Sequence, residues 1–152
     1  MRDERAHGGR RRALPGVLTG AGKLLERVLF TMSGVLGALG VLFGAFGAHG
    51  LRARLDALPD GALRRGWWET GAHYHLIHAL AIAVAGYLVS RAGTTAAAIS
   101  GFSFAFGIVL FSGSLYAMTI TGVRTLGAVT PLGGVLFVAG WVSLAISAWN
   151  LR

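Results

Sequence analysis

Residues 28–51 have the sequence VLFTMSGVLGALGVLFGAFGAHGL, in which Asp, Glu, Lys and Arg are absent. A helix of about 20 apolar residues is long enough to cross the hydrocarbon core of a bilayer. Three further runs without these charged residues follow, at 70–90, 92–123 and 125–151. The sequence therefore predicts an all-α, integral membrane four-helix bundle, with helices at about 28–48, 68–90, 95–120 and 128–149.

The composition agrees with a chain whose main partner is the lipid bilayer. Hydrophobic residues make up 54% of the 152 residues and charged residues 13%, whereas soluble domains carry about 25% charged residues. The net charge of +8 comes from basic residues that flank the apolar runs. Basic residues in such places are typical of headgroup anchors, so we expect no nucleic acid partner. Cysteine is absent, which excludes disulfides and thiolate metal sites.

The segments outside the apolar runs are short. Residues 1–27 are basic and are expected to form a disordered or surface-bound tail before a transmembrane domain at 28–151. The first apolar run exceeds the roughly 7–15 residues of a signal-peptide core, so we expect it to be retained as a helix. Residues 51–65 alternate leucine with arginine around Pro59-Asp60-Gly61, which predicts a short amphipathic segment lying in the membrane interface.

An even number of spans places both termini on one side of the membrane. The terminal side would carry Arg10, Arg11, Arg12, Lys23, Arg27, Arg91 and Arg152, and the other side Arg52, Arg54, Arg64, Arg65 and Arg124. This excess favours cytoplasmic termini in a cell (inner) membrane. Translation from Met32 would remove most of the first group and reverse the prediction.

Small residues form smooth faces on the predicted helices. The first helix carries Ser33, Gly37, Gly40, Gly44 and Gly47 at heptad-like spacing. Ser112, Gly113 and Ser114 in the third helix, and Gly133 and Gly140 in the fourth, extend the pattern. Such faces let helix backbones approach closely in lipid. Packing inside the bundle is the expected use, and contact with a second copy or another membrane protein is the alternative.

The candidate functional residues are a polar cluster at the junction of the first two helices. It comprises His49, Glu69, His73, Tyr74, His75 and His78. Ionisable groups at membrane depth mark a functional site by default. Antiparallel packing would bring His49 near His73 or His75, and His78 would lie deepest.

Three interpretations of this cluster remain open. The side chains could hydrogen-bond to one another and fix the junction. They could hold a metal or haem, with His75 and His78 as the first candidates, although no HExxH motif is present. They could form a proton or solute path through His78. Ser112 and Ser114 have no adjacent base to activate them, so we identify no catalytic residue and expect no cofactor.

Four motifs occur in a fixed order along the chain. They are GAFGAHGL at 44–51, YHLIHAL at 74–80, LFSGSLY at 110–116 and LGAVTPLGG at 126–134. Together they resemble the transmembrane protein 256 / YgdD family of small membrane proteins, catalogued as a domain of unknown function. The resemblance covers roughly Met32 to Asn150, and relatives commonly start near Met32. It implies a multi-pass protein of the bacterial inner membrane, or of mitochondria in eukaryotic members, with no established activity.

We therefore expect an accessory or structural membrane protein that binds partners or lipid. The alternative is a small permease, or an ion-, proton- or metal-binding membrane protein, that uses His49, Tyr74, His75 and His78.

Overall fold

The computed structural model describes residues 20–93 and 95–151, and over these residues the chain is helical with no strand. The elements in order are α1 (Gly20–Ala45), the π-helix η1 (Phe46–Leu51), α2 (Arg52–Asp56), α3 (Gly61–Ala92), α4 (Thr95–Gly107), the π-helix η2 (Ile108–Ser112), α5 (Gly113–Thr121), the 3₁₀-helix η3 (Arg124–Ala128) and α6 (Thr130–Trp149).

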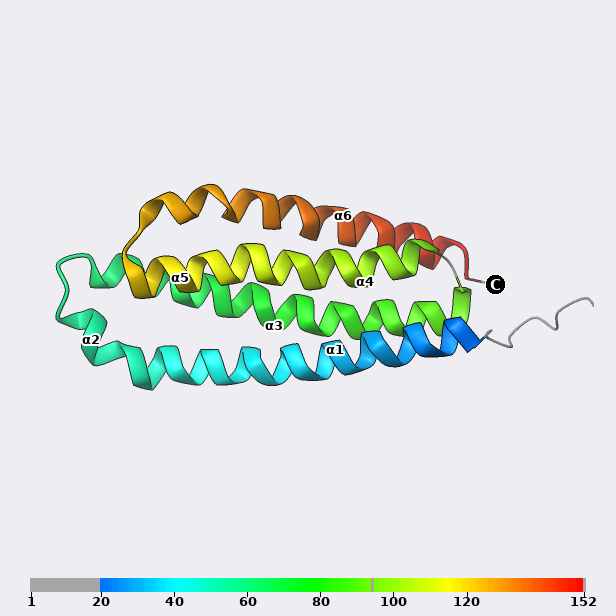
Figure 1. Cartoon of the computed structure of the whole chain (residues 1–152), viewed down its shortest axis with the longest axis horizontal. Helices are drawn as coiled ribbons and strands as arrows, with labels where there is room; N and C mark the ends of the chain where they lie inside the picture. Colours follow the sequence, from blue (N-terminus) through cyan, green and yellow to red (C-terminus); the bar gives the residue numbers. More distant parts are fainter. Residues whose placement is uncertain (1–19, 94, 152) are drawn as a thin grey trace, which may run out of the picture.

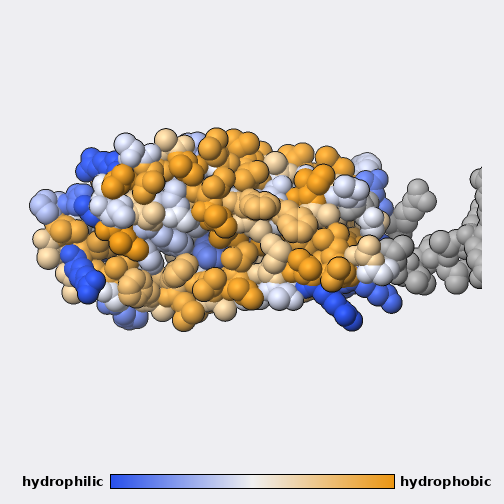
Figure 2. All heavy atoms as spheres, in the orientation of Figure 1, coloured by the Kyte–Doolittle hydropathy of each residue, from blue (hydrophilic) through white to orange (hydrophobic). Residues whose placement is uncertain are grey.

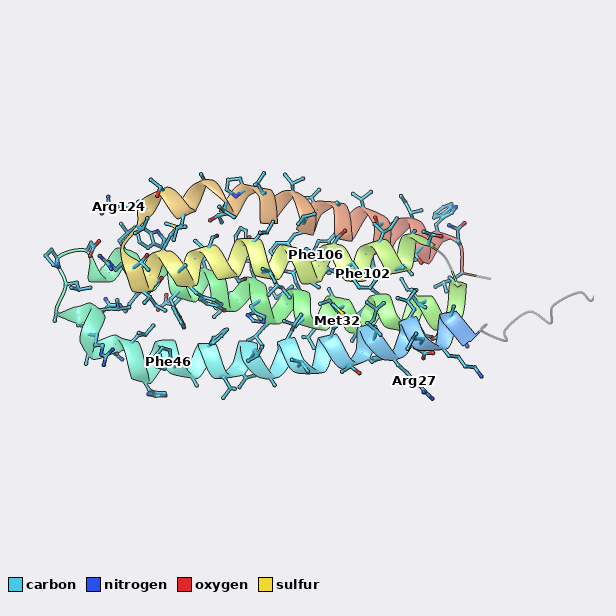
Figure 3. The ribbon with its side chains drawn as sticks, in the orientation of Figure 1. Arg27, Met32, Phe46, Phe102, Phe106 and Arg124 are labelled. Carbon is cyan, nitrogen blue, oxygen red and sulfur yellow. The ribbon has the colours of Figure 1, made fainter. Side chains whose placement is uncertain are left out.

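Successive elements join into long apolar helices. In the described part of the chain, four of them are long and apolar enough to cross a membrane: Gly20–Asp56, Gly61–Ala92, Thr95–Thr121 and Arg124–Trp149. Figure 2 shows hydrophobic side chains covering the middle of the molecule, with hydrophilic side chains gathered at its two ends. Arg27 and Arg124 lie at these opposite ends (Figure 3). The predicted all-α membrane protein with four spanning helices is confirmed.

The four helices lie side by side, with α1 and α6 on the outside and α3 and α4–α5 between them (Figure 1). α1 packs mainly on α3, and α6 packs mainly on α4 and η2. In the most apolar stretch of Gly61–Ala92, 56% of the residues are buried. In the corresponding stretch of Gly20–Asp56, only 11% are buried. α3 is therefore the central helix, and α1 leaves most of its surface to the surroundings.

Close packing in the core depends on small residues beside large ones. Leu29 of α1 is fully buried and reaches between α3 and α4. A Cβ placed on Gly101 would lie 2.6 Å from Leu29 Cδ2 and 3.4 Å from the Ala85 methyl, so only glycine leaves Leu29 this space.

The helices extend beyond the boundaries expected from hydropathy. α1 begins at Gly20, so the residues just before Val28 are helical, while residues 1–19 lie outside the described part. α3 begins at Gly61, well before the expected start near residue 68. The segment at 51–65 is broken by a turn, as Pro59-Asp60-Gly61 predicts: it comprises the last residue of η1, the short helix α2, the turn, and the start of α3.

Ion pairs hold together the helix ends on the two sides of the turn at 57–60. Arg65 pairs with Asp56 across the turn, and Arg64 Nε lies 2.9 Å from Asp60 Oδ1. The Arg64 guanidinium also donates to the Thr119 carbonyl at 3.3 Å, at the end of α5. Gly122 ends that helix in the left-handed conformation with φ 76°, which leaves room for this guanidinium.

Candidate functional site

His78 lies in the middle of α3 and is buried between α4 and α6. Its Nδ1 is 2.7 Å from the Tyr74 carbonyl, and its Nε2 is 3.2 Å from the indole Nε1 of Trp141. A carbonyl can only accept and an indole N–H can only donate, so His78 carries its proton on Nδ1 and a lone pair on Nε2. The imidazole is thereby held neutral, with both ring nitrogens occupied.

Aromatic rings from α3, α4 and α6 surround this imidazole. The Phe137 ring stacks on His78 with centroids 3.5 Å apart and an interplanar angle of 8°. Tyr74 stacks at 5.8 Å and is itself 40% exposed, packed on Phe111 at 4.7 Å. His78 itself is 3% exposed.

His75 faces different neighbours from His78. Its Nδ1 lies 3.3 Å from the Tyr116 hydroxyl of α5, and its ring packs against Phe43 of α1. Nε2 is buried and makes no hydrogen bond of standard geometry, although the Leu36 backbone of α1 also acts on the ring. A Cβ on Gly40 would lie 3.4 Å from His75 Cδ2, so the glycine lets α1 approach this ring. The two buried histidines therefore do not point into a common site.

Trp68 joins the start of α3 to the π-helix η1. Its indole N–H donates to the Phe43 carbonyl at 2.8 Å, and its ring packs against Tyr116 with centroids 4.5 Å apart and an interplanar angle of 46°. A Cβ on Gly47 would overlap this indole. Gly47 of the motif GAFGAHGL thus leaves the space that the Trp68 indole occupies.

The other predicted cluster residues are exposed and separate. His49 lies on η1, and no hydrogen bond or ring contact joins it to His73 or His75 within the described residues. Glu69 and His73 form no ion pair with one another, although they are four residues apart. Over residues 20–93 and 95–151, no group of three or more His, Asp or Glu side chains is placed to hold a metal ion.

The small residues divide into those at helix contacts and those that face open space. A Cβ on Gly40, Gly47, Gly133 or Gly140 would meet Leu76, Trp68, the Phe111 backbone or Phe104, respectively. Nothing lies within 4 Å of a Cβ on Gly37, Gly44 or Gly113. Ser114 bridges α5 and α6, because its hydroxyl donates to the Phe111 carbonyl at 2.9 Å and lies 2.8 Å from the Thr130 hydroxyl. Ser112 is buried with no partner for its hydroxyl.

Sequence reasoning missed the aromatic partners of the histidines. Trp141 and Phe137 sit on α6, far from His78 in the chain. One signal was available: Trp141 lies near the middle of a spanning helix, where its N–H needs an internal partner, and not in an interfacial belt.

Comparison with known proteins agrees with this architecture. The family model described as "Protein of unknown function (DUF423)" matches residues 43–134. The UPF0382 membrane protein YwdK of Bacillus subtilis is 40% identical over 123 residues, covering 80% of this chain and 96% of YwdK. A UPF0382 membrane protein of Staphylococcus epidermidis is 44% identical over 122 residues, covering 78% of this chain and 93% of that protein.

The UPF0382 inner membrane protein YgdD of Escherichia coli is 36% identical over 129 residues, covering 85% of this chain and 95% of YgdD. The resemblance inferred from the four motifs is confirmed. No solved structure matches the chain.

Proposed function

The chain belongs to the DUF423 family of membrane proteins, and on that premise we propose that it is an accessory membrane protein. Such a protein acts by binding lipid or other membrane proteins, and not by chemistry of its own.

The observation that carries this proposal is the hydrogen bonding of His78. Its two ring nitrogens are engaged by the Tyr74 carbonyl and the Trp141 indole. A metal ligand would need the Nε2 lone pair, and a proton carrier would need to break one of the two bonds. This buried ionisable group thus supports packing between α3 and α6.

The exposed surface of α1 supports a binding role. Gly34 and Gly37 have nothing within 4 Å of a Cβ position. Between α1 and α4 runs an apolar groove of about 440 Å³, with Met32, Phe102 and Phe106 in its lining (Figure 3). A smooth helix face beside a groove at membrane depth suits an acyl chain or a neighbouring helix.

A second candidate is a small permease or ion-binding protein. One observation favours it, which is the buried Nε2 of His75 without a hydrogen bond of standard geometry. A buried polar atom of this kind is costly unless water, an ion or a moving proton reaches it.

One experiment separates the two candidates. The purified protein and the variants His78→Ala, His75→Ala and Trp141→Phe are compared for metal content, visible absorption, proton flux in proteoliposomes and thermal stability. An accessory protein shows neither stoichiometric metal nor histidine-dependent flux, and His78→Ala and Trp141→Phe lose stability together. Metal or proton flux that disappears in a histidine variant of unchanged stability would establish the second candidate.

The proposal includes location in the cell (inner) membrane with cytoplasmic termini. The relative YgdD is named an inner membrane protein. Lys23, Arg27 and Arg91 lie at the end of the bundle that holds the termini, but Arg52, Arg54 and Arg65 lie at the other. A reporter fused after Arg152 that is active only outside the cytoplasm would reverse this orientation.

A further inference from the structure

A cavity of about 590 Å³ lies between the end of the first helix and the start of α3. Its lining has four charged residues, four small residues and two large apolar residues: Arg52, Asp56, Arg65 and Glu69; Gly44, Gly47, Ala48 and Ala72; and Leu55 and Trp68. The cavity belongs neither to the histidine contacts nor to the groove between α1 and α4.

Polarity changes along this cavity in the direction of the membrane. Gly44 lies eight residues before Arg52, and Ala72 lies seven residues after Arg65. At 1.5 Å per helical residue, the charged mouth and the small-residue floor are separated by about 10–12 Å. This distance is comparable to the depth over which a bilayer passes from headgroups to acyl chains. The cavity therefore matches the polarity of a lipid from its headgroup inward.

The charges at the mouth have both signs and are unevenly paired. Asp56 pairs with Arg65 and lies 3.9 Å from Arg52, so two guanidinium groups share one carboxylate. Glu69 has no hydrogen-bond or ion-pair partner in the described part of the chain. It lies one helical turn from Arg65 on the same face of α3. The mouth thus offers an excess positive charge beside an unpaired negative one.

We propose that this cavity binds a glycerophospholipid whose headgroup carries a primary ammonium, such as phosphatidylethanolamine. The phosphodiester lies against Arg52 and Arg65, the ammonium donates to Glu69, and the glycerol and first acyl carbons lie over Gly44 and Ala72. This inference rests on the proposed function and names the lipid that the accessory protein would bind.

Other headgroups fit the same charges less well. A quaternary choline has no N–H to donate to Glu69, so it forms no charge-assisted hydrogen bond. A glycerol headgroup carries no cation and leaves the Glu69 carboxylate beside a phosphate. The preference for a primary ammonium therefore depends on Glu69, while the affinity for phosphate depends on the arginines.

Lipid binding to the full-length protein in detergent tests the proposal. Short-chain phosphatidylethanolamine and phosphatidylcholine are titrated and the bound lipid is counted by native mass spectrometry. The wild type is expected to bind the ethanolamine lipid about tenfold more tightly, the size of one charge-assisted hydrogen bond. Glu69→Gln is expected to bring both lipids to the same affinity, while Glu26→Gln, at the opposite end of the bundle, behaves as wild type.

A second variant tests the floor of the cavity independently. The Cβ position of Gly44 has no atom within 4 Å, so Gly44→Leu fills the floor without displacing a neighbour at Cβ. It is expected to weaken both lipids. Equal binding of the two lipids by the wild type, or an unchanged preference in Glu69→Gln, overturns the proposal.

The source of the headgroup is settled in the same assay. Soluble glycerophosphoethanolamine is expected to compete weakly, because it lacks the acyl chain that the floor accommodates. Competition as strong as that of the lipid overturns a lipid ligand in favour of a soluble one. These failures leave the accessory role intact, since that role is refuted only by histidine-dependent metal binding or proton flux.

Discussion

The contact between α6 and the π-helix η2 gives a sharp prediction, because two adjacent glycines differ only in what they face. A Cβ on Gly133 would lie 2.7 Å from Phe111 Cβ and 2.8 Å from Phe111 Cα. The nearest atom to a Cβ on Gly134 is Phe111 Cδ2, at 4.0 Å. Carbon atoms pack best at about 3.5–4.0 Å. An alanine therefore fits at the second glycine and overlaps the backbone at the first.

The magnitude follows from comparing the two alanine variants. Both positions lie in the first turns of the same helix, so the gain in helix propensity, about 1 kcal/mol in water, is nearly shared. The overlap at Gly133 forces α6 away from η2, and overpacking of this kind costs about 1–3 kcal/mol. We expect Gly133→Ala to be less stable than Gly134→Ala by about 1–3 kcal/mol.

The assay is reversible unfolding in mixed micelles, followed by circular dichroism or by steric trapping. The wild type and the two single variants are measured under identical conditions, and the difference between the variants is the quantity of interest. Equal free energies of unfolding, or a more stable Gly133→Ala, would refute the close approach of the two backbones.

Three further predictions concern the other contacts. Trp141→Phe is expected to lower the free energy of unfolding by about 1 kcal/mol, because His78 loses its indole donor. Nitrogen NMR of the wild type should find His78 neutral with its proton on Nδ1, and a proton on Nε2 would contradict this hydrogen bonding. Gly47→Ala should destabilise the protein by about 1–3 kcal/mol and shift tryptophan fluorescence, whereas Gly44→Ala should do neither. Arg64→Gln should raise amide hydrogen exchange at the end of α5, and unchanged exchange would exclude the guanidinium as its cap.

The spanning helices could be predicted because the requirement that the bilayer imposes on a helix can be checked in a single sequence. Long runs without Asp, Glu, Lys or Arg are needed to cross hydrocarbon, and the chain has them. The ends of the helices were harder. Whether α3 begins at Gly61 or near residue 68 depends on ion pairs to Asp56 and Asp60, and these require the turn already to be folded.

The sequence predicted that His78 is buried, but it did not predict which side chains contact it. The position of His78 in the second apolar run indicated a buried histidine, and it is buried. Its partner Trp141 lies 63 residues later, and only the rotation of α6 brings the two side chains together. His75 is three residues earlier, yet it turns to Tyr116 and α1. Helix rotation is fixed by packing of whole surfaces, which a pattern along one helix does not contain.

The two π-helices give the family motifs a common physical explanation. A π-helix shifts backbone hydrogen bonds from i−4 to i−5 and frees carbonyl groups at its edges. In lipid, a freed carbonyl must find a donor inside the protein. The Trp68 indole donates to the Phe43 carbonyl, three residues before η1, and the Ser114 hydroxyl donates to the Phe111 carbonyl within η2.

GAFGAHGL contains the π-helix η1, LFSGSLY overlaps the last three residues of η2, and the Thr130 hydroxyl that contacts Ser114 lies in LGAVTPLGG. Ser114 of LFSGSLY and Trp68, which lies outside the motifs, thus donate to backbone carbonyls beside or within the π-helices. A side chain already committed to a carbonyl is a poor nucleophile or proton carrier. Substitutions of Trp68 and Ser114 should accordingly be measured first as a loss of folding, before any assay of activity is interpreted.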